Sequence, residues 1–134
     1  MTRGLGALLL ILLGVLGAAG CSTGPDLCER TEVKRVAAPE GDRAAVVFVK
    51  NCGATTGYST HVSVVAPDQA VGDDNEIFSA DGDDGVVPLG PDNALALRVT
   101  WSAADRLMIE YPAGTRIFTQ QPDRGPIKID YRES

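Results

Sequence analysis

The residues best suited to covalent chemistry are the cysteines and the single histidine. Cys52 and His61 could form a pair in which the imidazole removes the thiol proton. Cys28 competes for Cys52, because two cysteines in an oxidising compartment usually close a disulfide. The sequence shows neither an acid to orient His61 nor an oxyanion-stabilising group. We therefore expect a Cys28–Cys52 disulfide and no enzyme activity, with a hydrolase that uses His61 as the alternative.

Carboxylates are concentrated between residues 68 and 92, and no Lys or Arg occurs between Asn51 and Leu97. Within this stretch, residues 81–85 superficially resemble a calcium loop. The fifth position is Gly85, where an EF-hand requires an oxygen ligand, so the match fails. We expect a solvated turn, with no metal site and no cofactor, and weak calcium binding stays an open alternative. A protruding acidic loop over residues 73–84 would suit an inhibitor or immunity-type protein that blocks a basic cleft.

The first twenty residues have the composition of a signal peptide. Arg3 supplies a positive start, residues 5–16 are almost entirely apolar, and three small residues precede Cys21. The strongly apolar part is about fifteen residues long, shorter than the roughly twenty that a membrane-spanning helix needs. We expect a signal helix at residues 1–20 that is removed from the mature protein.

The run Ala18-Ala19-Gly20-Cys21 resembles the lipobox of bacterial lipoproteins, although Leu is commoner at the position of Ala18. The resemblance implies cleavage before Cys21 and acyl chains on its sulfur and new amino group, which anchor the protein to a membrane. Two or three such chains hold firmly, whereas one holds only marginally. Ser22 favours the outer membrane, facing the periplasm or the cell surface. Residues 21–30 would then form the lipidated cysteine and its tether.

The run from Cys52 to Val64, CGATTGYSTHVSV, resembles a motif of uncharacterised small exported bacterial domains. That resemblance carries no known activity. Its loop is expected to be a disulfide end followed by a hydrogen-bonded threonine turn. The functional alternative is a ligand-facing loop with Thr55, Thr56 and His61 as candidate binding residues, since exposed loops carry much recognition.

Charge and composition exclude one class of partner. Removal of Arg3 leaves 11 basic residues against 18 acidic ones, so the mature chain carries 11 − 18 = −7. A protein that binds the nucleic-acid backbone needs a basic face, so we expect no nucleic-acid partner.

Residues 31–134 have the pattern of one small all-β domain, an antiparallel sandwich or open barrel of about seven or eight short strands. Residues 31–37 are expected to form an edge strand. Residues 43–50 are apolar on both faces and should be central and covered on both sides. In residues 58–66, alternation assigns one set of side chains to the core: Tyr58, Thr60, Val62 and Val64. It assigns the other set to solvent or a shallow covering layer: Ser59, His61, Ser63 and Val65.

The C-terminal part shows the clearest alternation. Residues 95–101 and 107–111 predict a β-hairpin with one buried face and Trp101 as a core anchor. Short strands are expected at residues 76–79, 115–119 and 127–131. We expect an envelope lipoprotein whose domain binds another envelope component, such as a protein or a glycan.

Overall fold

The computed structural model describes residues 27–53 and 55–134. The predicted signal helix, the lipidation of Cys21 and the sorting role of Ser22 lie outside these residues. No helix within these described residues is long and apolar enough to span a membrane.

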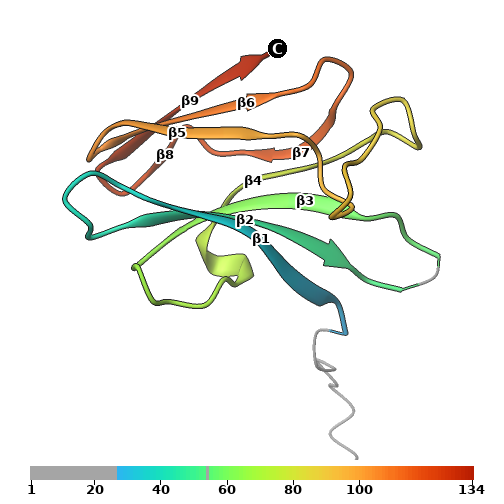
Figure 1. Cartoon of the computed structure of the whole chain (residues 1–134), viewed down its shortest axis with the longest axis horizontal. Coiled ribbons are helices and arrows are strands. Elements are labelled where there is room, and N and C mark those ends of the chain that lie inside the picture. Colours follow the sequence, from blue (N-terminus) through green and yellow to red (C-terminus); the bar gives the residue numbers. More distant parts are fainter. Residues whose placement is uncertain (1–26, 54) are drawn as a thin grey trace, which may run out of the picture.

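The described chain is all-β, as predicted, and consists of nine strands and one short 3-10 helix (Figure 1). The elements are β1 (Glu29–Ala37), β2 (Ala44–Asn51), β3 (Ser59–Val65), η1 (Asp73–Asn75), β4 (Glu76–Asp81), β5 (Arg98–Ala103), β6 (Arg106–Tyr111), β7 (Arg116–Gln120), β8 (Asp123–Arg124) and β9 (Ile127–Glu133). The structure has nine strands where the sequence predicts seven or eight, and one of the nine is the two-residue β8. β1 begins at Glu29, inside the segment assigned to the tether.

The strands form two stacked sheets, a sandwich rather than a barrel. One sheet has the order β1-β2-β3-β4-β7 and the other the order β5-β6-β9-β8. All pairings are antiparallel except β6 with β9, which is parallel and makes the second sheet mixed. The predicted antiparallel sandwich is therefore present, with this one parallel pairing. This pairing arises because the chain leaves β6, crosses to the other sheet as β7, and returns to lie beside β6.

The core lies between the sheets. Its fully buried members include Val62, Phe78, Leu107 and Ile109. Phe78 of β4 stacks on two tyrosines of the opposite sheet, Tyr111 and Tyr131, with ring centroids 5.9 and 6.0 Å away. Such aromatic contacts add to the free energy gained from burial alone. This cluster therefore links the two sheets.

The predicted hairpin is confirmed as β5 and β6, with Val99 facing Ile109 across the ladder. Trp101 packs against the core, as predicted, and is half-buried. Its indole Nε1 donates a hydrogen bond to the Val36 carbonyl at 2.9 Å. Because Val36 belongs to β1, this bond joins edge strands of the two sheets.

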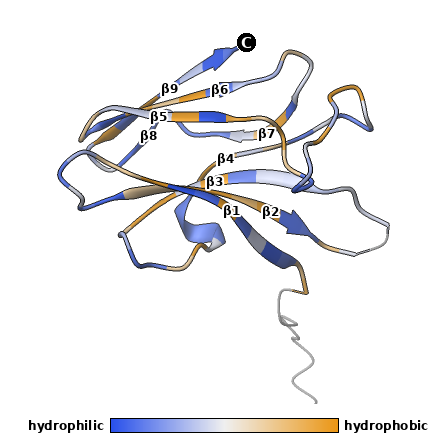
Figure 2. Cartoon of the chain, viewed as in Figure 1, coloured by the Kyte–Doolittle hydropathy of each residue, from blue (hydrophilic) through white to orange (hydrophobic). Residues whose placement is uncertain are grey.

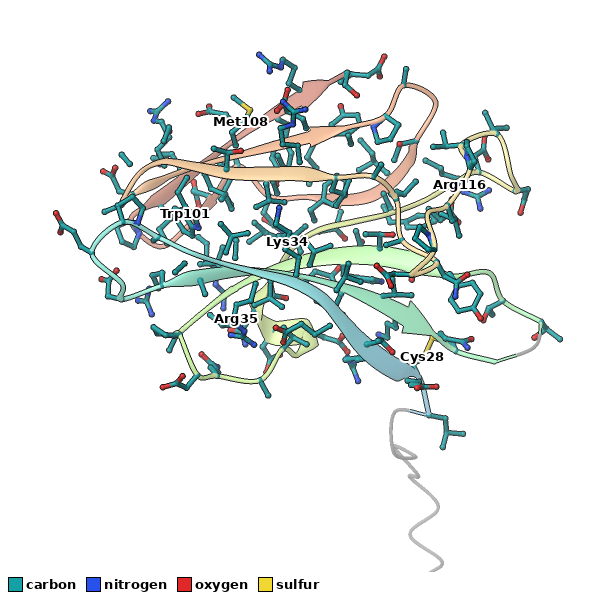
Figure 3. The ribbon with its side chains drawn as sticks, in the orientation of Figure 1. Cys28, Lys34, Arg35, Trp101, Met108 and Arg116 are labelled. Atoms are coloured by element: carbon teal, nitrogen blue, oxygen red, sulfur yellow. A yellow bond between two sulfur atoms is a disulfide. The ribbon has the colours of Figure 1, made fainter. Side chains whose placement is uncertain are left out.

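The outer face of the five-stranded sheet is covered by residues 66–75, which Figure 1 shows beneath β2 and β3. Val46, Phe48 and Val65 on this face are buried, although they lie outside the core cluster. Arg35 of β1 donates to the Pro67 and Gln69 carbonyls at 2.9 and 3.3 Å, and its side chain is labelled in Figure 3. The expectation that β2 is covered on both sides is therefore confirmed.

β1 is the edge strand that the sequence predicts, and Figure 2 shows it as largely hydrophilic. Charged side chains on an exposed edge discourage pairing with other chains. β1 also carries a bulge between Glu32 and Lys34, which interrupts its regular register with β2.

Candidate functional site

Cys28 and Cys52 form a disulfide, with an S–S bond of 2.05 Å and Cα atoms 4.0 Å apart. It sits one residue beyond the pair Glu29 and Asn51, at the end of the β1–β2 ladder. Figure 3 labels Cys28 where the described chain begins. Because both sulfurs are bonded to each other, Cys52 has no thiol with which to form the alternative nucleophilic pair with His61.

The threonine turn after β2 is hydrogen-bonded in the way the sequence predicts. The backbone N–H and the hydroxyl of Thr56 both donate to the Gly53 carbonyl, at 3.2 Å each. Thr55 and Thr56 are exposed. His61 is 7% exposed and lies within β3. The three candidate binding residues therefore divide into an exposed turn and a buried imidazole, and their role in binding stays a prediction.

His61 is the centre of a hydrogen-bonded row on the outer face of the sheet. Its Nδ1 lies 2.7 Å from Glu76 Oε2, and its Nε2 lies 2.7 Å from Ser59 Oγ. Phe48 stacks on the imidazole with ring centroids 5.1 Å apart. The sequence assigns His61 to solvent or a shallow covering layer. The structure shows the second of these, because the side chain is buried on the covered outer face of the sheet. The sequence reasoning did not find the acid partner.

Glu76 reaches His61 because of a bulge at the start of β4. Val62 lies opposite Phe78, but the next residue, Ser63, lies opposite Glu76, so Ile77 is an extra residue. Residues directly opposite each other share a face of the sheet. Glu76 therefore shares the outer face with Ser63 and His61, while Ile77 joins the core. Bulges commonly redirect a side chain in this way.

The row has the atom order of a hydroxyl, a base and an acid. A carboxylate at Nδ1 holds the neutral imidazole with its proton on that nitrogen, which leaves Nε2 to accept the hydroxyl proton of Ser59. Ser59 is half-buried, and the Glu76 side chain is 16% exposed. The arrangement can thus hold Ser59 as a hydrogen-bond donor to an imidazole. Acyl transfer would require an oxyanion hole in addition.

The acidic stretch is paired with cations from distant strands. Asp73 accepts from Arg30 Nη2 at 2.9 Å and from Lys50 Nζ at 3.2 Å. These hydrogen bonds, that of Arg30 above all, lower the pKa of Asp73 from its usual value. Residues 76–81 form β4, which is inside the sheet, so residues 73–84 are not the single protruding loop that the inhibitor alternative would use.

Residues 81–85 form a turn organised by Arg116. The guanidinium lies 2.6 Å from Asp81, 3.1 Å from Asp83 and 3.7 Å from Asp84. The hydrogen bond from Arg116 lowers the pKa of Asp81. Among the described residues, no group of three His, Cys, Asp or Glu side chains could hold a metal ion. The three carboxylates of the calcium-like sequence therefore all pair with the Arg116 guanidinium.

A groove of about 340 Å³ lies beside the start of β1. Its lining includes Val33, Val49, Tyr58 and Asp92. Tyr58 is 38% exposed, so its assignment to the core by alternation was wrong. It precedes β3, and the pleat that alternation assumes does not extend to it.

The chain matches no protein-family model, and comparisons with curated proteins and with solved structures found no significant similarity. The resemblances of the N-terminal segment and of residues 52–64 stay predictions.

Proposed function

We propose that this protein is a lipoprotein of the bacterial cell envelope, anchored through acyl chains on Cys21, whose β-sandwich binds another envelope component. The observation that carries the proposal is the Cys28–Cys52 disulfide, seven residues after the lipobox cysteine. Structural disulfides persist in exported proteins and are rare in the cytosol. The lipobox-like run and the disulfide-stabilised domain are independent features, and both support export.

The position of the disulfide suits an anchored domain. The disulfide links Cys28, the cysteine nearest to the anchor, to Cys52 in the β2–β3 turn. Force applied to the tether is therefore transmitted to the sheet. Seven residues from Cys21 to Cys28 span at most about 25 Å. The domain would therefore stay close to the membrane, with its Cys28 end toward the lipid and the opposite end of β2 directed away.

Lipidation is tested by expressing the full chain in a bacterial host with radiolabelled palmitate. The wild type should incorporate label, lose its first twenty residues and partition with membranes. Cys21→Ser should do none of these. A double variant, Cys28→Ser with Cys52→Ser, should still be labelled, which separates anchoring from folding. An unlabelled wild-type protein that retains its N-terminus would refute the anchor.

The same material tests export. Both remaining cysteines should resist a maleimide reagent until a reductant is added. Free thiols at Cys28 and Cys52 in freshly lysed cells would contradict an oxidising compartment. For the binding role, the wild-type protein would be crosslinked in intact cells and compared with Cys21→Ser. A crosslinked envelope partner that depends on the anchor is the expected result.

A second candidate function, a serine hydrolase, is favoured by one observation, the row Ser59–His61–Glu76. In it, Ser59 would be the nucleophile, His61 the base and Glu76 the group that orients the imidazole. A fluorophosphonate probe should then label the wild type and fail to label Ser59→Ala. Equal labelling of the two proteins, or none of either, would refute this candidate and leave the row as a structural hydrogen-bond network.

A further inference from the structure

Two arginines that are far apart in the sequence, Arg43 and Arg124, line one pocket at one end of the sandwich. Arg43 immediately precedes β2, and Arg124 is the last residue of β8. The pocket between them has a volume of about 180 Å³. Its remaining walls come from the end of β3, from the covering segment and from the β8–β9 turn: Val64, Val65, Gln69, Asn75, Gly125, Pro126 and Ile127. No carboxylate is among these lining residues.

The lack of a carboxylate partner distinguishes these two arginines from most other cations of the described chain. Of the eleven basic residues in the described part of the chain, eight pair with a carboxylate: Arg30, Arg35, Lys50, Arg98, Arg106, Arg116, Lys128 and Arg132. The other three, 11 − 8, are Lys34, Arg43 and Arg124. Two of these three line the same pocket, in a protein whose acids outnumber its bases.

The two amides of the pocket are oriented by bonds within the protein. Gln69 Oε1 accepts from the Ala66 N–H at 3.1 Å, and Asn75 Oδ1 accepts from Arg124 Nη2 at 3.0 Å. Their oxygens are thereby used, and their NH₂ groups have no partner among the described residues. Four side chains of the pocket therefore carry donors to spare, and none of them is an anion.

We propose that this pocket binds a phosphate group, most naturally a phosphate monoester. A monoester carries between one and two negative charges at neutral pH and accepts several hydrogen bonds, which matches two guanidiniums and two amide NH₂ groups. Arginine forks suit phosphate oxygens better than lysine does. A pocket of this size is smaller than the roughly 300–1,000 Å³ of sites that hold a whole drug-sized ligand. It therefore receives the anionic group while the rest of the ligand stays outside.

The pocket lies at the end of the sheet that is distant from Cys28. β2 runs from Ala44, beside Arg43, to Asn51, beside Cys52, and seven steps along a strand cover roughly 23 Å. In the anchored protein this end is directed away from the membrane. The ligand we assign is accordingly a soluble or partner-borne phosphate ester. The inference specifies what the proposed binding domain binds and in that respect rests on the proposed function.

The test is a calorimetric titration of the purified protein, in neutral detergent at low ionic strength, with inorganic phosphate. The wild type should bind it, with Arg43→Gln and Arg124→Gln each weakening the affinity at least about tenfold. Lys34→Gln is the matched control, because it removes an equally unpaired charge that lies on β1, and it should change the affinity less than about twofold. Added salt should weaken wild-type binding.

A second variant tests the pocket without removing either arginine. Asn75→Asp retains both arginines and nearly the same shape, but it places a carboxylate beside Arg124, and it should abolish phosphate binding. Failure of the wild type to bind, equal loss in Lys34→Gln, or undiminished binding by Asn75→Asp would each overturn the site. Since phosphate binding by the folded domain does not require acylated Cys21, this outcome and the palmitate result can fail separately.

Discussion

Removal of the Cys28–Cys52 disulfide should cost much stability while leaving the native fold in place. The disulfide closes a chain segment with a sequence separation of 24 residues. The ends of that segment are also held by the ladder, because Glu29 already lies opposite Asn51. Replacing both cysteines with serine therefore removes a constraint on the unfolded chain, whereas β1 and β2 still pair in the folded one.

The magnitude follows from the length of the closed loop. In the chain-entropy model, a loop of about 25 residues gives a stabilisation of roughly 3.5 kcal/mol at 25 °C. A domain of about 110 residues unfolds with an entropy near 2.1 cal/mol/K per residue, so the same loss lowers the melting temperature by about 15 °C. The unfolded chain also becomes more expanded without the crosslink, and the denaturant m-value should rise.

The assay is urea unfolding followed by tryptophan fluorescence and circular dichroism, with calorimetry for the melting temperature. Trp101 reports directly, because its indole bridges β5 and β1. The control is wild type with and without a reductant, which should reproduce the loss without any substitution. A loss below about 1 kcal/mol would refute the entropy reasoning. An altered near-ultraviolet spectrum in the folded variant would show that the disulfide holds the native pairing itself.

Four further substitutions have expected outcomes. Tyr131→Phe should lower the free energy of unfolding by about 1–2 kcal/mol, because the hydroxyl lies 2.6 Å from the Gln121 carbonyl and 3.0 Å from that of Ile77. Burial raises the pKa of Tyr131 far above its usual value, so wild-type stability should fall as the pH rises above about 10, and the Phe variant should lack this component in alkaline melts. Arg116→Gln should flatten the acid side of the stability profile, because the lowered pKa of Asp81 adds stability at neutral pH that disappears below about pH 4; an unchanged acid slope in urea titrations would contradict this. Glu76→Ala should cost about 1–3 kcal/mol by leaving the His61 Nδ1–H without an acceptor, whereas Ser59→Ala should cost less because water can reach the half-buried Ser59 position; equal losses in parallel urea unfolding would refute the assignment of burial.

The sequence predicted those features that depend on local alternation. The β5–β6 hairpin follows from apolar residues at every second position, and the burial of β2 on both faces follows from an uninterrupted apolar run. The Cys28–Cys52 disulfide was predicted because these are the two cysteines that remain once Cys21 is assigned to lipidation. In each case the information lies within one or two adjacent strands, where the pleat fixes which side chains share a face.

The features that were missed depend on irregularities and on distant partners. Strict alternation from Ser79 places Ile77 on the outer face and Glu76 in the core, and the bulge reverses both. Nothing local indicated that the segment 66–75 covers the sheet, because the cations that pair with its Asp73, Arg30 and Lys50, lie on β1 and β2. Nothing local indicates that Arg43 and Arg124 would meet, since only the tertiary fold brings their strands to one end.

The final strand of the chain occupies the interior of its sheet. β9 lies between β6 and β8, and the Ser134 N–H donates to the Tyr111 carbonyl at 2.9 Å. During synthesis from the N-terminus, neither sheet can be completed early. The first sheet needs β7 to pair with β4, and the second needs β9 to pair with β6. The edge of β6 would stay open until β9 has been synthesised, and during that interval chaperones or proteases can bind it. Loss of β9 would thus leave an incomplete sheet exposed to quality control, rather than a slightly shorter domain.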